Sequence, residues 1–481
     1  MTVTAWCTPT AHLRLGTGVA DITPPADAYH RNWGAALHDA AESIHRPLSA
    51  TALVLQDPDS GPEHLLVALD LGWMRTAEVR QLLDRVAAGT GIQRDRLLIT
   101  FSHTHAAINL DRTRTHEPGG QHIEPYLQAL PERIVTAVER ARADLKPVTL
   151  TFGQGHCSLA VNRDYVDPED GVRVCGPNPE EAADDRVWVA RATSATDASQ
   201  VVLVNYACHP TTLAWDNRCI SPDYPGAMRA LVQQNSAARC AFLLGPCGDL
   251  GPRDGFVGNP QVADDNGRQL GYAVLSVLAG LPPADTQMTY TGKVVSGATV
   301  GVWQHEPIAA ARHPRIRTFR STELCVELPY KDLPGREVLE RRLATWRSRE
   351  TRAQQAGNDT ELRDCRAQIE RIRRAMRRLE ELPDTRDATA TYKVAVWQLG
   401  EGVLIGVGGE PYSLLQRTLR QRFPETPILI TVLTNEPYSY ILPAELYGSE
   451  CYQDQCSTLA AGALEGIMDA IQQQLRDWGC R

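Results

Sequence analysis

The sequence predicts an α/β fold in which a mixed sheet is flanked by helices. Short, continuous apolar runs recur along the chain, and they alternate with longer segments whose apolar residues recur at helical spacing. The chain has 481 residues, of which 43% are hydrophobic and 22% are charged, so it is large enough to bury such a sheet and ordinary in composition for a globular protein. We expect a single domain over residues 1–481.

The first 330 residues supply most of the expected elements. Apolar runs that fit strands are residues 51–55, 64–70, 97–101, 201–205 and 241–245, and helix-like stretches are residues 78–88 and 125–145. Because strands buried on both faces read as continuous apolar runs, we expect a largely buried sheet.

A charged segment interrupts this alternation at residues 334–382. It is crowded with Arg and Glu and carries apolar residues at helical spacing, namely Leu362, Ile369, Ile372, Met376 and Leu379. A Gly357-Asn-Asp turn divides it, which predicts a helical hairpin. Its charges fit a solvated helix face, and the alternatives are contacts in an oligomer or a cover over the active site.

Strand-like runs return after the charged segment, at residues 394–398, 403–407 and 428–432. An amphipathic helix is expected over residues 458–478. Since strands resume, we interpret the hairpin as an insertion in one catalytic domain.

Charge and composition exclude several classes of protein. The net charge of −9 argues against a nucleic-acid partner, which requires a basic face. The N-terminus shows neither a basic nor an apolar signal region, and no apolar stretch reaches the roughly 18 residues that cross a bilayer. The twelve cysteines are scattered, so reduced thiols and a cytoplasmic location are expected; the closest pair, Cys451 and Cys456, leaves a bond or metal binding open.

Two histidines stand two residues apart at the end of an apolar run. His103 and His105 follow the expected strand that ends at Phe101. Since residues i and i+2 of a strand point to one face, both imidazoles are expected to emerge together where the strand gives way to a loop. Neutral imidazole is a common zinc ligand, and loops after strands often carry catalytic residues.

Two further polar residues follow apolar runs in the same way. His209 comes after the run 201–205 and precedes Pro210, and Glu410 follows the run 403–407 within Gly-Gly-Glu-Pro. His209 is either a metal ligand or a satisfied core histidine. Glu410 is a metal ligand, an N-cap of the next helix, or both.

Acids and tyrosines complete the set of candidates. Asp223 and Asp249 lie in Gly/Pro-rich turns, where turn chemistry alone also explains an Asp. Tyr438, Tyr440 and Tyr452 lie near the C-terminus. Histidine, glutamate and tyrosine at strand ends from distant parts of the chain predict a catalytic metal site.

The ordered set of motifs resembles the neutral/alkaline ceramidase family of zinc-dependent amidases. The resemblance spans about residues 14–475. It rests on Gly16-Thr-Gly-Val-Ala-Asp-Ile-Thr-Pro-Pro25, Leu69-Asp-Leu-Gly72, Ser102-His-Thr-His105, Val161-Asn-Arg163, Asn205-Tyr-Ala-Cys-His-Pro210, Ser221-Pro-Asp-Tyr-Pro-Gly226, Gly248-Asp249, Gly409-Glu410 and the tyrosine-rich tail. It implies a ceramidase-like catalytic domain.

The resemblance implies a zinc site and a substrate site. The implied zinc ligands are His103, His209, Glu410 and Tyr440, and the implied substrate contacts are His105, Arg163 and Tyr452. The choice of Tyr440 over Tyr438 rests on the family's spacing from Asn435 to Tyr440 and on to Tyr452.

Two residues keep other roles open. Arg163 contacts the oxyanion, clamps a substrate carboxylate or forms a structural salt bridge. Asp249 is a candidate for proton handling or for orienting a histidine.

The chain departs from the family pattern in ways that indicate a substrate other than ceramide. The family's HTHSGPGG loop reads His-Thr-His-Ala-Ala-Ile-Asn-Leu, and Gly251 replaces a serine. The ceramidases also carry an export signal and a C-terminal β-sandwich, neither of which is expected here.

We therefore expect a zinc-dependent hydrolase that cleaves an amide, or an ester or lactone, of a small soluble molecule in metabolism or biosynthesis through a zinc-activated water. The alternatives are a catalytically silent binding or scaffold protein and a true ceramidase acting on N-acyl sphingoid lipids. We expect no membrane span, and a homo-oligomer is possible.

Overall fold

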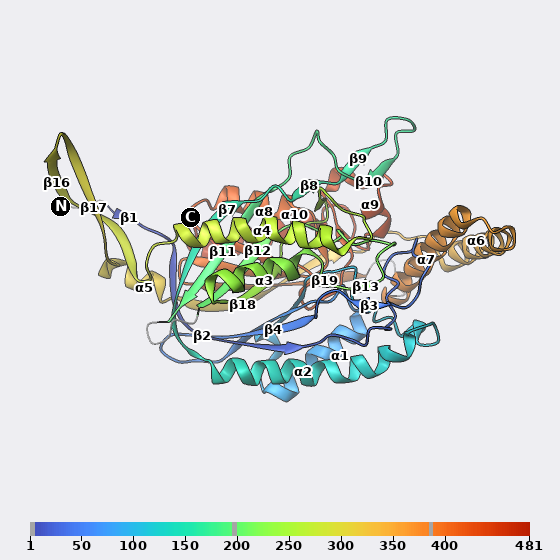
Figure 1. Cartoon of the computed structure of the whole chain (residues 1–481), viewed down its shortest axis with the longest axis horizontal. Helices are drawn as coiled ribbons and strands as arrows, with labels where there is room; N and C mark the ends of the chain where they lie inside the picture. The colour runs from blue at the N-terminus through green and yellow to red at the C-terminus, as the bar shows by residue number, and fades with distance from the viewer. Residues whose placement is uncertain (1–4, 195–199, 384–387) are drawn as a thin grey trace.

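Two β-sheets packed face to face form the centre of the structure, and helices cover the outer face of each sheet (Figure 1). This computed structural model describes residues 5–194, 200–383 and 388–481. The mixed α/β fold with flanking helices is confirmed. The centre of the fold, however, consists of two packed sheets and not of one.

The larger sheet has eight strands in the order β14-β12-β11-β7-β2-β4-β5-β6. Their bounds are Arg239–Leu244, Gln200–Tyr206, Arg186–Thr193, Lys146–His156, Thr10–Asp21, Ser49–Gln56, His64–Leu69 and Leu97–Phe101. The pairs β12/β14 and β5/β6 are parallel and the other neighbours are antiparallel.

The smaller sheet packs on one face of the larger sheet. Its strands, in the order β18-β19-β20-β22, are Phe319–Pro329, Thr389–Leu399, Gly402–Val407 and Ile428–Thr431. In β4, Leu53 and Leu55 point to the cluster that contains Trp397 of the smaller sheet, whereas Val54 points to the helix-covered side. Both faces of the strand are buried, so its sequence reads as a continuous apolar run.

Helices cover the outer faces of both sheets. The larger sheet packs against α1 (Thr76–Thr90), α2 (Ile123–Ala143), α3 (Tyr224–Ser236) and α4 (Pro260–Gly280), and the smaller sheet against α8 (Leu414–Arg422) and α10 (Ala463–Asp477). A Cβ added at Gly16 or Gly18 of β2 would lie 2.0 Å from a carbonyl oxygen of α2. The glycines of the N-terminal motif therefore allow α2 to pack directly on the strand.

Two hairpins project from opposite ends of the molecule (Figure 1). The charged segment forms α6 (Arg336–Ala356) and α7 (Asp359–Glu381), with Gly357 in the left-handed conformation between them. At the other end, β16 (Thr286–Ser296) and β17 (Ala298–Pro307) form an antiparallel hairpin that the sequence did not indicate. The description of residues 334–382 as an insertion in one catalytic domain stays a prediction.

The segment near the C-terminus begins with a short helix, α9 (Tyr452–Cys456), before α10. All twelve cysteines are free, so Cys451 and Cys456 at the two ends of α9 are not bonded. Within the described ranges, no helix has both the length and the apolarity needed to cross a membrane.

Candidate active site

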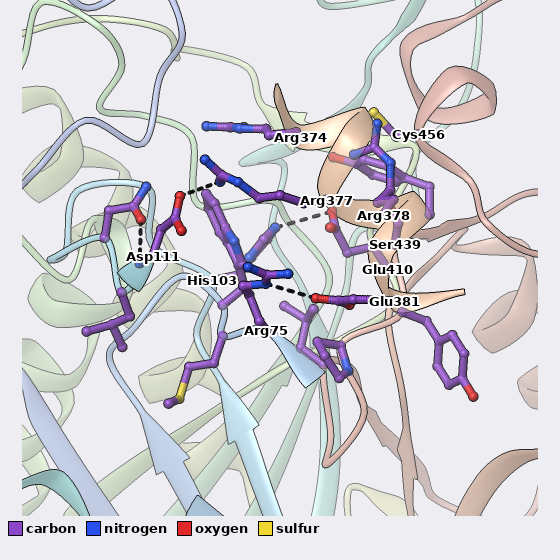
Figure 2. A pocket seen from close by; sticks show the side chains of 18 of the residues that line it. Arg75, His103, Asp111, Arg374, Arg377, Arg378, Glu381, Glu410, Ser439 and Cys456 are labelled. Carbon is purple, nitrogen blue, oxygen red and sulfur yellow. Dashed lines mark hydrogen bonds and ion pairs between the residues drawn. The ribbon is translucent and has the colours of Figure 1, made fainter. Parts of the chain in front are cut away.

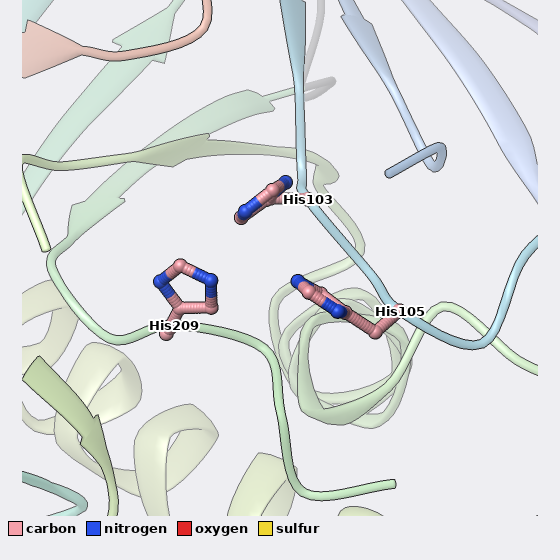
Figure 3. A group of neighbouring side chains, drawn as sticks. All are labelled: His103, His105 and His209. Carbon is pink, nitrogen blue, oxygen red and sulfur yellow. The ribbon is translucent and has the colours of Figure 1, made fainter. Parts of the chain in front are cut away.

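Three strand ends place the principal site residues together. His103 follows β6, His209 follows β12 and Glu410 follows β20, so the site draws on both sheets. The imidazoles of His103 and His209 have ring centroids 4.5 Å apart, and His105 lies 4.8 Å from His103 (Figure 3). The structure therefore brings together residues that are about 100 to 300 positions apart in the sequence.

The orientation of His103 is fixed by the backbone. His103 has a φ of 66°, and its Nδ1 lies 2.8 Å from the carbonyl oxygen of Gly72. Since a carbonyl only accepts, Nδ1 carries the proton, and Nε2 presents its lone pair. Nε2 lies 3.2 Å from Oε2 of Glu410, so the motif that ends at Gly72 directs His103 to the carboxylate.

His103 and His105 do not alternate along a strand, contrary to the expectation from the sequence. β6 ends at Phe101, and the positive φ of His103 turns the chain, so the two residues are not part of a regular strand. Their rings still face a common centre, because the loop and not the pleat aims them (Figure 3).

His209 is buried and holds its second nitrogen toward the same carboxylate. It makes a hydrogen bond to the backbone of Cys247, and its Nε2 lies 3.7 Å from Oε2 of Glu410. Burial, together with the charge of Arg163, lowers the pKa of His209 well below its ordinary value. The ring is therefore neutral near pH 7 and has a lone pair to offer.

Glu410 is placed by a two-residue parallel bridge. β21 (Glu410–Pro411) pairs with β23 (Tyr440–Ile441), and Glu410 stands opposite Tyr440. Burial alone would raise the pKa of the Glu410 carboxyl, but His103, Tyr440 and Arg163 hold it below its usual value. Glu410 does not cap α8, whose N-cap residue is Ser413.

The preceding Gly409 is needed for this geometry. Its φ is 66°, and an added Cβ would lie 2.6 Å from the carbonyl oxygen of Ser439. A side chain there would separate the two short strands that hold Glu410 beside Tyr440.

Tyr440 and Tyr438 lie in different surroundings. The Tyr440 ring stacks on the His209 ring, with the two ring centroids 6.2 Å apart. The Tyr438 ring packs on the Tyr392 ring instead, with a centroid distance of 5.0 Å. The chain between Tyr438 and Tyr440 is irregular and not a regular strand. The Tyr440 side chain is the one that joins the His103, His209 and Glu410 cluster.

Arg163 holds the hydroxyl of Tyr440 in place. Its guanidinium donates to the carbonyl oxygen of Gly248 at 2.9 Å and to the Tyr440 hydroxyl at 3.1 Å, and it is buried. No ion pair of Arg163 occurs among the described residues, so the salt-bridge alternative is wrong.

Asp249 lies outside the cluster. Its carboxylate accepts from the backbone N–H and the hydroxyl of Ser413, both at 2.6 Å, and it contacts no histidine in the ranges described. Asp249 therefore anchors the start of α8 at Ser413, three residues after Glu410. Its contacts do not orient a histidine. Burial raises its pKa, although the Ser413 hydrogen bonds oppose this.

His105 and Tyr452 face open space. A cavity of about 170 Å³ is lined by His103, His105, Glu410, Tyr440 and Tyr452. Both ring nitrogens of His105 are buried and without a hydrogen-bond partner, and its ring lies 5.1 Å from that of Trp33 and 5.5 Å from that of Trp73. His105 is thus presented to the cavity between two aromatic rings.

Helix α7 closes one side of this cavity (Figure 2). It contributes Glu370, Arg374, Arg377, Arg378 and Glu381, none of which was a candidate from the sequence. Of the alternatives for the charged hairpin, a cover over the site therefore describes α7. Arg371, Arg374 and Arg378 recur at helical spacing, which is the signal that could have identified one inward-facing side.

The donor atoms fit a divalent metal such as zinc. His103 Nε2, His209 Nε2 and Glu410 Oε2 are buried and lack a hydrogen-bond partner. Buried polar atoms are rarely left unpaired, and these three converge from different elements. Histidine nitrogen and carboxylate oxygen are the usual ligands of catalytic zinc. His105 lies close enough to be a further ligand, since one nitrogen of each of the three histidines lies within 4.8 Å of the others.

The fold and the matching sequence together define the class of protein. Residues 13–250, just under half of the chain, match the family described as neutral/alkaline non-lysosomal ceramidase, N-terminal. The matched part includes His103, His105, Arg163, His209, Asp223 and Asp249, whereas Glu410, Tyr440 and Tyr452 lie beyond it.

Particular relatives are a neutral ceramidase and two solved structures. The neutral ceramidase of Pseudomonas aeruginosa is 26% identical over 267 residues, which cover 50% of this chain but only 37% of that protein. A structure described as a ceramidase complexed with C2 has a TM-score of 0.62 at 17% identity, covering 98% of this chain and 76% of the other. The neutral ceramidase structure from P. aeruginosa has a TM-score of 0.59 at 17% identity, covering 97% and 73%. These structures share the fold.

Proposed function

We propose that the chain is a zinc-dependent hydrolase that cleaves an amide bond, or a related ester or lactone, in a small soluble molecule. The observation that carries the proposal is the convergence of three unpaired, buried donor atoms, His103 Nε2, His209 Nε2 and Glu410 Oε2. The match of residues 13–250 to the ceramidase family supports the amide as the bond that is cleaved.

His103, His209 and Glu410 would hold the metal, with the Tyr440 hydroxyl oxygen as a fourth ligand. Bound zinc supplies a water of lowered pKa and polarises a carbonyl. The protein residues keep these ligands ready: Gly72 fixes the tautomer of His103, and Arg163 holds the Tyr440 hydroxyl.

His105 and Tyr452 would contact the substrate. Burial lowers the pKa of His105 well below its ordinary value, so the ring is neutral and carries one donor and one acceptor nitrogen. A neutral imidazole in the cavity wall is able to donate to the carbonyl oxygen or to the leaving nitrogen. In the overall reaction water adds its oxygen to the carbonyl carbon, the C–N bond breaks and the amine leaves with a proton.

The test is removal and restoration of the metal during turnover. N-benzoylglycine and a set of other small N-acyl compounds would be assayed before and after dialysis against 1,10-phenanthroline. We expect hydrolysis to be lost on dialysis, to return with added zinc, and to be absent in Glu410→Gln. Hydrolysis that persists at full rate in metal-free protein would contradict the proposal.

A further inference from the structure

A second, larger cavity adjoins the first and has an aromatic wall. Its volume is about 480 Å³, and it shares His105, Tyr440 and Tyr452 with the first cavity. Trp33, Trp215 and Phe256 form the aromatic wall, with ring centroids 5.8 to 6.5 Å apart. An apolar ring or short alkyl chain would bury favourably there.

The same cavity is lined by one face of α7. Arg371, Arg374 and Arg378 are three and four residues apart, so their side chains lie along one side of the helix. Arg173 of β10 (Arg173–Cys175) also reaches this cavity. The lining is therefore aromatic in one part and cationic in another.

The arginines differ in whether the protein already satisfies them. Arg374 donates to Glu370 at 3.1 Å and to the carbonyl oxygen of Asn32 at 2.6 Å. Within residues 5–194, 200–383 and 388–481, the guanidiniums of Arg173, Arg371 and Arg378 have neither a hydrogen bond nor an ion pair. Three cations at the cavity thus have donors to spare.

The acids of the cavity do not neutralise these cations. The cavity is lined by five arginines and two glutamates, Glu370 and Glu450. Glu370 is already paired with Arg374 and with Arg114. Glu450 is exposed, and no ion pair joins it to another described residue. A surplus of positive charge remains beside the aromatic wall.

Helix α7 is fixed in a way that keeps its arginines in position. Arg366 pairs with Asp39 at 3.0 Å, and Arg377 pairs with Asp111. These ion pairs join the helix to loops of the main body, so the guanidiniums are held at the cavity before any ligand binds.

We propose that this cavity recognises an anionic group, a carboxylate or a phosphate, on a substrate whose apolar part lies against Trp33, Trp215 and Phe256. Arg371, Arg378 and Arg173 bind the anion, and the amide extends toward His105 and the first cavity. The inference rests on the proposed function and gives it a substrate class, acidic N-acyl compounds such as N-acyl amino acids. A guanidinium is able to donate two parallel hydrogen bonds to a pair of oxygens of either anion.

Binding is tested with compounds that the enzyme does not hydrolyse. Isothermal titration calorimetry would compare benzenesulfonylglycine with benzenesulfonylglycinamide, and with the aminomethylphosphonate analogue as the phosphate arm. We expect the intact protein to bind one of the anions at least about 10-fold more tightly than the neutral amide. In Arg371→Gln/Arg378→Gln that preference should fall to about 2-fold or less. Equal affinities in the intact protein, or an unchanged preference in the double variant, would overturn the inference.

Two control variants separate a local effect from a general one. Arg352→Gln removes an exposed arginine of α6 that lines neither cavity and should leave the preference unchanged. Glu450→Gln removes an acid from the cavity and should tighten anion binding by about 2-fold, a gain that loss of folding cannot produce.

Turnover distinguishes this inference from the proposed function. If N-benzoylglycine is not hydrolysed but the anion preference is present and lost in the double variant, only the hydrolase proposal fails. If N-benzoylglycine and its neutral amide are hydrolysed with equal kcat/KM, only the anion-binding inference fails.

Discussion

At the scale of single residues, the site depends on how each donor is aimed. Gly72 fixes the tautomer of His103, the backbone of Cys247 holds His209, and Tyr440 stands opposite Glu410. These partners precede or follow the donors by about 30 to 40 residues in the sequence. Each donor therefore depends on the partner that orients it. The residue type identifies the donor in the sequence but not this partner.

Tyr440 and Tyr438 provide a matched pair of variants. Tyr440→Phe removes an oxygen that lies beside Glu410 and Arg163, so we expect kcat to fall by about two to three orders of magnitude while the fold survives. Tyr438→Phe should lower kcat less than about 3-fold, because that ring packs on Tyr392. Steady-state rates of both variants check this. If Tyr438→Phe is the inactive one, the assignment of Tyr440 fails.

His105 tests the division between metal ligands and substrate contacts. Since its ring lies between Trp33 and Trp73 and has two unpaired nitrogens, we assign it to the substrate. His105→Ala should retain zinc by elemental analysis and lose about 100-fold or more in kcat. Loss of zinc together with activity would instead make His105 a third histidine ligand.

The sequence predicts which residues form the site better than it predicts how their side chains are oriented. Strand-end positions and motif order point to His103, His209, Glu410 and Tyr440, and these four side chains lie together in the structure. The turn at His103 could not be read from alternation, since a positive φ at a non-glycine residue is set by contacts such as the hydrogen bond to Gly72. The partner of Asp249 was also not predictable, because Ser413 is 164 residues away.

At the scale of elements, α7 has the largest consequence for the site. Its charges suggested a solvated face, because a helix rich in Arg and Glu is usually exposed. Instead three of its charged residues, Arg366, Glu370 and Arg377, form ion pairs with Asp39, Arg114 and Asp111 of the main body. The sequence shows the charges but not their distant partners.

The ion pairs of Glu370 predict how α7 responds to acid. Burial would raise the pKa of Glu370, but Arg374, Arg114, Arg377 and Arg31 outweigh it and lower the pKa to about 2, from an ordinary 4.5. The folded pKa is depressed, so the stabilisation is complete above about pH 4.5 and is lost as the pH falls toward 2. It amounts to about 3 kcal/mol.

Hydrogen exchange of the α7 amides measures this contribution. At pH 7 the intact protein should protect residues 359–381 about 100-fold more than Glu370→Gln does. The difference should shrink as the pH is lowered from 4.5 toward 3. A difference that is independent of pH would show that the carboxylate charge does not hold the helix.

At the scale of the whole molecule, the two sheets make one site. The side-chain amide of Asn205 on β12 donates to the carbonyl oxygens of Leu243 at 3.0 Å and Ile430 at 2.7 Å, which joins the larger sheet to β22 of the smaller one. Apolar runs predict strands, but strands buried on both faces carry no pattern that assigns them to one sheet or to two. The second sheet therefore appears only in the structure.

The cavity shape and charge predict discrimination against ceramide. The residues after His105, Ala106 to Ile108, are apolar and buried, and the larger cavity beyond them carries unpaired arginines. A long alkyl chain buried against these guanidiniums would displace their water. Because the chain offers no hydrogen-bond acceptor in exchange, such binding is unfavourable. We expect kcat/KM for ceramide in mixed micelles to be at least about 100-fold below that for an acidic N-acyl amide in the same assay. Comparable values would establish a true ceramidase.

The central claim is that His103, His209 and Glu410 hold a catalytic zinc. Elemental analysis of the intact chain and of His209→Ala tests it most directly, with His116→Ala, an exposed histidine, as the matched control and circular dichroism as the check on folding. We predict about one zinc per chain in the intact protein and in His116→Ala, and almost none in a folded His209→Ala. Full zinc occupancy in His209→Ala would contradict the account.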